Sequence, residues 1–219
     1  MTRLCRHLWG YWGLMSLSVI LCIITGGCQI LGLVMYKTAG DPDVPAQYTL
    51  VQKQTLILVE NYRYTRAAAE DAELLGRLIH ARLSRKNLVP LIGHEKLLEL
   101  KATQPQNFNR MTIVDIAHQL GAEQVIYVHF QGGGVTSMGG GSIRQGQASV
   151  LVRVVDTQTG QTVWPTGIED GRVVSTETDP ASIGSKPESD IRLRLYDDLA
   201  MKIVRLFHSW KPDSSDMTD

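Results

Sequence analysis

The sequence of 219 residues has little cysteine and no excess of charge of either sign. Its three cysteines, Cys5, Cys22 and Cys28, all lie near the N-terminus. The rest of the chain therefore has no thiol nucleophile, no disulfide and no cysteine-based metal site. Lys plus Arg and Asp plus Glu each total 22, and no run of five like charges occurs. Because nucleic acids are bound by basic faces, this balance argues against a nucleic-acid partner.

Sequence signatures of catalysis are also missing. The chain has no His-Glu-x-x-His motif, no Gly-x-Ser-x-Gly motif and no Gly-Lys dipeptide after its glycine run. Glu60 and Asn61 follow the first predicted strand, where α/β folds often contact ligands. A single carboxylate with no visible partner is a weak indication of acid–base chemistry. His129 lies inside a predicted strand, which is typical of a hydrogen-bonded core residue. We therefore predict no catalytic residue, no metal ligand and no cofactor.

Basic residues precede a long apolar segment at the N-terminus. Arg3 and Arg6 are followed by the apolar stretch 14–25 and then by two glycines and Cys28. This order is typical of a secretory signal. Small residues directly before a cysteine resemble a bacterial lipobox, in which the cysteine is lipidated and becomes the first residue. Thr25 departs from that pattern, because a leucine usually stands there. We expect residues 1–28 to be a signal peptide that ends at the lipidation site, Cys28.

The same region allows two other interpretations. No Asp, Glu, Lys or Arg occurs from His7 to Tyr36, and a membrane-spanning helix needs about 20 apolar residues. An uncleaved anchor that reaches about residue 36 would also fit, with its basic end in the cytoplasm. A signal cleaved without lipidation would instead release the body. The first two interpretations attach the body to a membrane of the cell envelope, facing the periplasm or the exterior. Residues 37–54 are expected to be a tether.

The most regular strand pattern in the chain lies in the segment 145–164. Residues 148–155 alternate with period two and are rich in valine, which predicts a half-buried strand. Residues 156–160 contain the aspartate and glycine of a turn. The returning strand stops before Pro165, which has no N–H to donate. A third strand over 172–178 is expected to extend this hairpin.

Periodicity also assigns the remaining elements. Strands are predicted at 55–60, 88–92 and 124–131, and a polar loop at 102–110. Helices are predicted at 65–85, at 94–101, from a capping box at Thr112 to Gly121, and from Ser189 as N-cap to His208. Alternating elements followed by a meander predict an α/β (α+β) fold. We expect one sandwich domain over 55–208, with a mixed sheet, helices packed on it and a C-terminal helix, followed by a disordered tail over 209–219.

Six glycines lie in the ten residues between the strand at 124–131 and the hairpin. Phosphate-binding loops place glycines between a strand and a helix, whereas this segment leads into another strand. We therefore predict a flexible loop that joins two strands, and we hypothesise that it contacts a protein partner. The loop comprises Gly132, Gly133, Gly134, Val135, Thr136, Ser137, Met138, Gly139, Gly140 and Gly141.

Two stretches resemble a pattern of bacterial envelope proteins. They are MTIVDIAHQLGAEQVIYVHF at 111–130 and ASVLVRVVDTQTGQTVW at 148–164. With them, residues 55–208 resemble the amino-terminal domain of TolB-type proteins and the core of curli-secretion-channel-type lipoproteins. The resemblance implies a non-catalytic α/β domain used for protein–protein contact. No propeller repeats follow the domain, and no pair of long alternating segments suits pore strands, which need about 9–11 residues each.

The sequence thus favours a membrane-anchored cell-envelope lipoprotein that acts as a non-catalytic module for protein interaction or assembly. Its expected partners are a membrane, through the lipid or an N-terminal helix, and an envelope protein or further copies of itself. One alternative is a subunit of an oligomeric export or secretion complex. A less favoured one is a ligand-binding protein or hydrolase that uses Glu60 and the glycine-rich loop.

Overall fold

The computed structural model describes residues 43–61, 65–141, 143–168, 170–182 and 186–212. Nearly all of them belong to one compact unit, Pro45–Ser209. In a second unit, Val44 and Trp210 form an antiparallel bridge. The expected signal or anchor with Cys28, the start of the tether and the end of the tail lie outside the described residues. Among the residues that are described, no helix is both long and apolar enough to cross a bilayer.

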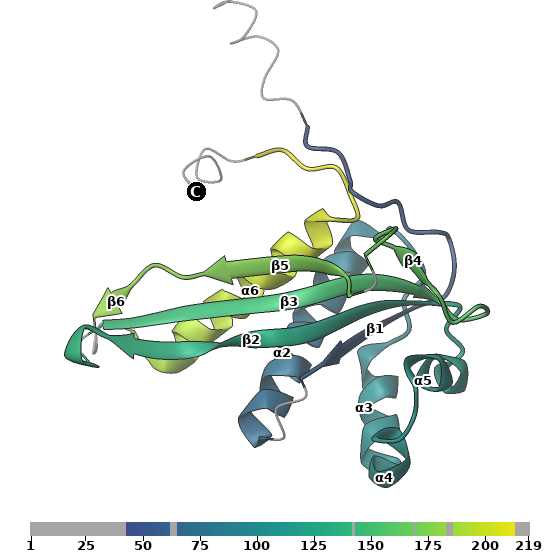
Figure 1. The fold of residues 1–219 in the computed structure, drawn as a ribbon, viewed down its shortest axis with the longest axis horizontal. Coiled ribbons are helices and arrows are strands. Elements are labelled where there is room, and N and C mark those ends of the chain that lie inside the picture. Colours follow the sequence, from purple (N-terminus) through teal and green to yellow (C-terminus); the bar gives the residue numbers. More distant parts are fainter. Residues whose placement is uncertain (1–42, 62–64, 142, 169, 183–185, 213–219) are drawn as a thin grey trace, which may run out of the picture. The chain divides into compact units, whose positions relative to one another are not determined.

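A six-stranded mixed sheet forms the centre of the main unit. In this sheet β1 (Thr55–Glu60) runs parallel to β2 (Gln124–Met138), and β2 runs antiparallel to β3 (Ile143–Asp156). Three short strands share the other side of β3, one after another along its length. They are β4 (Thr162–Trp164), β5 (Arg172–Glu177) and β6 (Ala181–Ser182). Figure 1 shows that β2 and β3 are much longer than the strands beside them.

Helices cover this sheet on both faces and create two hydrophobic cores. On one face lie α2 (Arg66–Lys86) and α6 (Glu188–Arg205), and on the other lie α3 (His94–Thr103), α4 (Pro105–Phe108) and α5 (Ile113–Leu120). Strand β2, which the sequence predicted at 124–131, supplies both cores through the alternation of its side chains. Ile126, Val128 and Phe130 enter the core with α2 and α6, whereas Val125 and Tyr127 enter the other. The single α+β domain with a mixed sheet is therefore confirmed.

The first long helix follows its predicted pattern closely. The hydroxyl of Thr65 accepts a hydrogen bond from the N–H of Ala68, and Asn87 closes the helix in the left-handed conformation. Its apolar residues recur every three to four positions, as the prediction of a helix requires, and five of them are buried: Ala68, Ala72, Leu75, Ile79 and Leu83. The capping box of α5, made by Thr112 and Asp115, is also present.

Three local predictions were wrong. Residues 88–92 form one bridge from Leu91 to Thr55 instead of a strand, because Pro90 has no N–H with which to extend a ladder. The predicted loop at 102–110 contains α4, because Phe108 is buried against the second core. Helix α6 begins at Glu188 with Pro187 as its N-cap, and the Ser189 hydroxyl donates to Asp190 instead of capping the helix.

The glycine-rich segment is the largest difference from the sequence prediction. Residues 132–138 continue β2 and pair with β3 from Gly132 opposite Ser149 to Met138 opposite Ile143. Only the short turn η1 (Gly139–Gly141) joins the two strands. The segment is therefore the end of a long hairpin and not a flexible loop. The predicted hairpin of β3 and β4 is confirmed, with the Asp156 carboxylate accepting N–H bonds from Gln158 and Thr159 in its turn.

Candidate functional site

The first candidate site is the end of the β2–β3 hairpin, Gly132–Gly141, which we name the hairpin tip. Strand β1 pairs with β2 only as far as Glu60 opposite His129. Beyond that point β2 and β3 run on together to the η1 turn (Figure 1). The hairpin tip therefore contains all ten residues that the sequence singled out as a contact segment. It presents them as a paired strand and a turn.

Glycine is needed in this strand because β3 comes very close to it. A β-bulge separates Phe130 from Gly132. At Gly133 φ is +158°, and a Cβ there would lie 2.9 Å from the Cβ of Ala148. Any other residue at this position would collide with β3. Gly133 thus permits close strand pairing, and the sequence could not reveal this because it does not show which strand lies opposite.

Helix α6 supports one face of the hairpin. The rings of Phe130 and Tyr196 meet edge to face, with centroids 5.8 Å apart. Nearer the tip, a Cβ on Gly146 would lie 3.2 Å from the Leu195 side chain. The tip itself has no charged side chain, and Thr136 and Ser137 are exposed. The hairpin tip is therefore a supported, uncharged surface suited to backbone and hydroxyl contacts.

A second candidate is a polar cluster on the sheet, made by Glu60, Tyr127, His129 and Arg153. The Tyr127 hydroxyl donates to Glu60 Oε2 at 2.7 Å. The guanidinium of Arg153 lies over the Tyr127 ring, 4.8 Å from its centroid, and the His129 ring centroid is 6.4 Å from that of Tyr127. Glu60 thus has a partner that sequence reasoning missed, because the pairing of β1 with β2 was not predicted. The alternation along β2 could have suggested Tyr127, which shares a face with His129.

A third candidate is a pair of histidines between α2 and α3. The rings of His80 and His94 have centroids 6.5 Å apart, and the Nε2 atoms of both are buried without a hydrogen-bond partner. Burial lowers the pKa of His94, and the nearby His80 lowers it further. The sequence placed these residues on separate helices and missed their contact. Within the described part of the chain, no three His, Cys, Asp or Glu residues are grouped so as to hold a metal ion.

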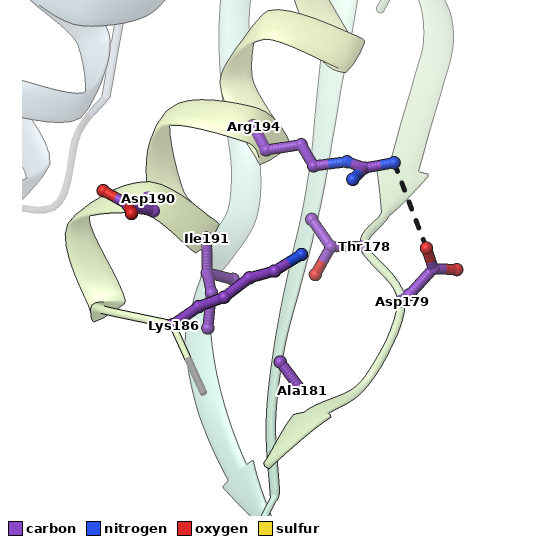
Figure 2. A pocket seen from close by; sticks show the side chains of 7 residues that line it. All are labelled: Thr178, Asp179, Ala181, Lys186, Asp190, Ile191 and Arg194. Atoms are coloured by element: carbon purple, nitrogen blue, oxygen red, sulfur yellow. Dashed lines mark ion pairs between the residues drawn. The ribbon is translucent and has the colours of Figure 1, made fainter. Parts of the chain in front are cut away.

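A fourth candidate is a pocket of about 260 Å³ between the start of α6 and the segment around β6. Figure 2 shows the side chain of Arg194 reaching toward Asp179, with Lys186 extending toward Thr178. The guanidinium of Arg194 lies 4.0 Å from the carboxylate of Asp179. Two basic and two acidic residues line the pocket, so its charge selects neither anions nor cations. Its size is below the roughly 300–1,000 Å³ of typical ligand sites. The lining residues are Thr178, Asp179, Ala181, Lys186, Asp190, Ile191 and Arg194.

Comparison with known proteins gives only similar folds. No family model and no curated protein matches the sequence. A lipoprotein from Neisseria meningitidis is 12% identical, with a TM-score of 0.44, over 69% of this chain and 98% of that chain. PelC from Paraburkholderia phytofirmans, solved as a dodecamer, is 13% identical with a TM-score of 0.41, over 75% and 94% of the two chains. A minor lipoprotein from Acinetobacter baumannii is 12% identical with a TM-score of 0.40, over 74% and 99%. The solved structures similar to this chain thus include bacterial lipoproteins, and the resemblance to TolB-type proteins stays a prediction.

Proposed function

We propose that this chain is a membrane-anchored lipoprotein of the bacterial cell envelope whose domain is a non-catalytic module for protein interaction or assembly. The anchoring part rests on the sequence around Cys28, where two glycines precede the cysteine after a long segment without charge. A single acyl chain binds a bilayer only marginally, so stable attachment requires further acyl chains or a spanning helix. The tether then carries the domain away from the membrane.

The hairpin tip is the observation that carries the interaction part. It extends past the end of β1, is supported by α6 and exposes Thr136 and Ser137 without any charged side chain. Because the hairpin is already ordered, it loses little conformational entropy when a partner binds. Uncharged residues with a strand backbone favour contact through main-chain hydrogen bonds.

The contacts of the other candidate sites support a non-catalytic role. In the polar cluster, the carboxylate of Glu60 accepts a hydrogen bond from the hydroxyl of Tyr127, so each of the two polar groups has a hydrogen-bond partner. In the pocket, Arg194 lies 4.0 Å from Asp179. Both arrangements have a structural explanation that requires no substrate.

Site-specific photo-cross-linking in living cells tests this function. The full chain would carry a photoreactive amino acid at Ser137 in the hairpin tip or, as a matched control, at Gln158 in the β3–β4 turn. Both positions are exposed and uncharged and lie at the end of a hairpin. We expect a discrete cross-linked product from position 137 and little or none from position 158.

Equal products from both positions, or none from either, would contradict the proposal. Point labelling is preferable to deletion of residues 133–140. That deletion would remove one strand of the hairpin tip and leave residues 143–148 of β3 without their partners on β2. Loss of capture would then report damage to the sheet instead of loss of a contact.

A further inference from the structure

Among the described residues, no strand pairs with the outer side of β2 over Phe130–Met138, which we name the free edge. On the side of β3, pairing continues to Met138. On the side of β1, pairing ends at His129, and no strand in the described residues takes its place. Backbone N–H and C=O groups that point outward along the free edge are therefore available to another strand.

The free edge lacks the side-chain features that usually protect such edges. Natural edge strands carry charges, proline or distorting bulges that prevent pairing with another chain. From Phe130 to Gly141 the sequence has neither a charged residue nor a proline, and the bulge lies only at the base, next to Phe130. A Cβ on Gly134 would meet nothing within 4 Å, so no neighbouring atom covers the strand at this position. Such glycines often mark places where another backbone approaches closely.

Two other strand edges are partly protected. The Lys202 ammonium donates to the backbone carbonyl of Ser175 in the middle of β5 at 3.3 Å, and Arg172 and Glu177 are exposed at the two ends of that strand. At the start of β1, Thr55 exchanges backbone hydrogen bonds with the segment around Pro90, whereas the rest of this six-residue strand is an edge of the sheet. The free edge is therefore the longest strand edge in the described residues that no charge or second segment protects.

We propose that the free edge pairs antiparallel with the free edge of a second copy of this chain. A two-fold axis makes one strand edge complementary to itself. Because the segment is uncharged, two copies placed side by side do not repel each other. Because the β5 edge is protected, the pairing closes after two copies instead of growing head to tail into a fibre. The product is a dimer in which the two sheets form one continuous sheet through the two β2 strands.

This inference deepens the proposed function and rests on it, because it names the partner of the hairpin tip as the chain itself. The dimer needs no ligand and no charged counterpart. Pairing along the strand edge also leaves the contacts of α6 with the hairpin in place.

Measuring the mass of the purified full chain in mild detergent tests the inference. We expect light scattering to give the mass of two chains. We also expect hydrogen exchange to show amides in Phe130–Met138 that are protected at high protein concentration and lose protection on dilution. The exchange measurement needs no variant, so it remains informative even if a substitution impairs folding.

A pair of matched double variants locates the interface. Gln131→Lys with Thr136→Lys adds two charges to the free edge, whereas Gln158→Lys with Thr166→Lys adds the same residues at exposed positions outside β2. The edge variant should have the mass of one chain, and the control variant should keep the mass of two. Circular dichroism should show that both are folded.

A wild-type chain that stays monomeric at all concentrations would overturn the inference, as would a dimer or larger assembly that the edge lysines leave unchanged. The two proposals fail separately. If position 137 captures a different protein in cells while the pure chain is monomeric, the interaction module stands and self-pairing is wrong. If neither experiment yields a partner, both are wrong.

Discussion

At the scale of single residues, the histidine pair is the least expected feature of the domain. The His94 ring packs over Gly76 of α2. A Cβ on Gly76 would lie 3.0 Å from the Cε1 atom of His94. Leaving the Nε2 atoms of His80 and His94 without partners costs free energy, and adding a proton there would place a charge between two helices. The charged groups that act on this proton are Glu73 and Arg77 on α2 and Lys101 on α3. Glu73 opposes the lowering of the pKa, whereas the two cations assist it.

This environment predicts that the domain loses stability in mild acid. The pKa of His94 in the folded state lies below its ordinary value of about 6.5, mainly because the ring is buried. Below that value the unfolded chain binds a proton that the folded chain does not bind, so the free energy of unfolding decreases as the pH falls. Denaturant titrations between about pH 7.5 and 5 should show this decrease.

The variant His94→Gln should have a flatter pH profile of the free energy of unfolding than the wild type. The carboxyl of Asp156 affects stability at lower pH than His94 does, because a hydrogen bond from Lys53 holds the pKa of Asp156 below its usual range. An unchanged profile in the His94 variant would contradict the assignment.

At the scale of elements, three ion pairs connect α2 and α6, which are far apart in the sequence. Arg192 on α6 contacts Asp71 and, at 3.9 Å, Glu70 on α2. Arg82 on α2 contacts Asp197 on α6 at 2.6 Å. The side chain of Asp71 is only 14% exposed. Because a mostly buried carboxylate needs its partner, this contact helps to fix how the two helices pack over the sheet.

We expect Arg192→Ala to lower the free energy of unfolding by about 1.5–3 kcal/mol, the range for a charge-assisted hydrogen bond. Arg66→Ala serves as the matched control, because Arg66 pairs with Glu70 on the same helix with 94% of its side chain exposed. Surface pairs of this kind contribute little to stability. Equal losses in the two variants, measured by denaturant unfolding, would show that the α2–α6 ion pair has no special role.

At the scale of the whole molecule, Cys28 tests the proposed attachment to a membrane. If Cys28 is the lipidation site, Cys28→Ser should accumulate as a heavier precursor that keeps its signal and lacks the lipid. Mass spectrometry of the protein extracted from membranes measures both changes. Cys22→Ser is the matched control, because it makes the same substitution inside the apolar segment. A Cys28 variant that differs from the wild type only by the exchanged atom would favour the uncleaved membrane anchor.

Prediction from sequence succeeded for elements whose signal is local. The stripe of α2, the capping box of α5 and the alternation of β2 depend on residues a few positions apart, and each has its predicted form. Prediction failed where a distant segment decides the structure. Phe108 turns a polar stretch into α4 by entering a core, and Ala148 shows that Gly133 belongs to a strand. Glycine tolerates both loops and strands, so composition alone could not distinguish them.

The sequence by itself determined the class of the domain, its long helices and its long strands, because hydrophobic periodicity and capping residues act within one turn or one strand. It also contained the charge-free N-terminal segment and Cys28. Only the tertiary structure decided which groups meet. The partner of Glu60, the contact between His80 and His94 and the free edge of β2 all depend on pairing between segments distant in the chain. Register and packing arise when the whole sheet assembles around its two cores, and no local pattern encodes them.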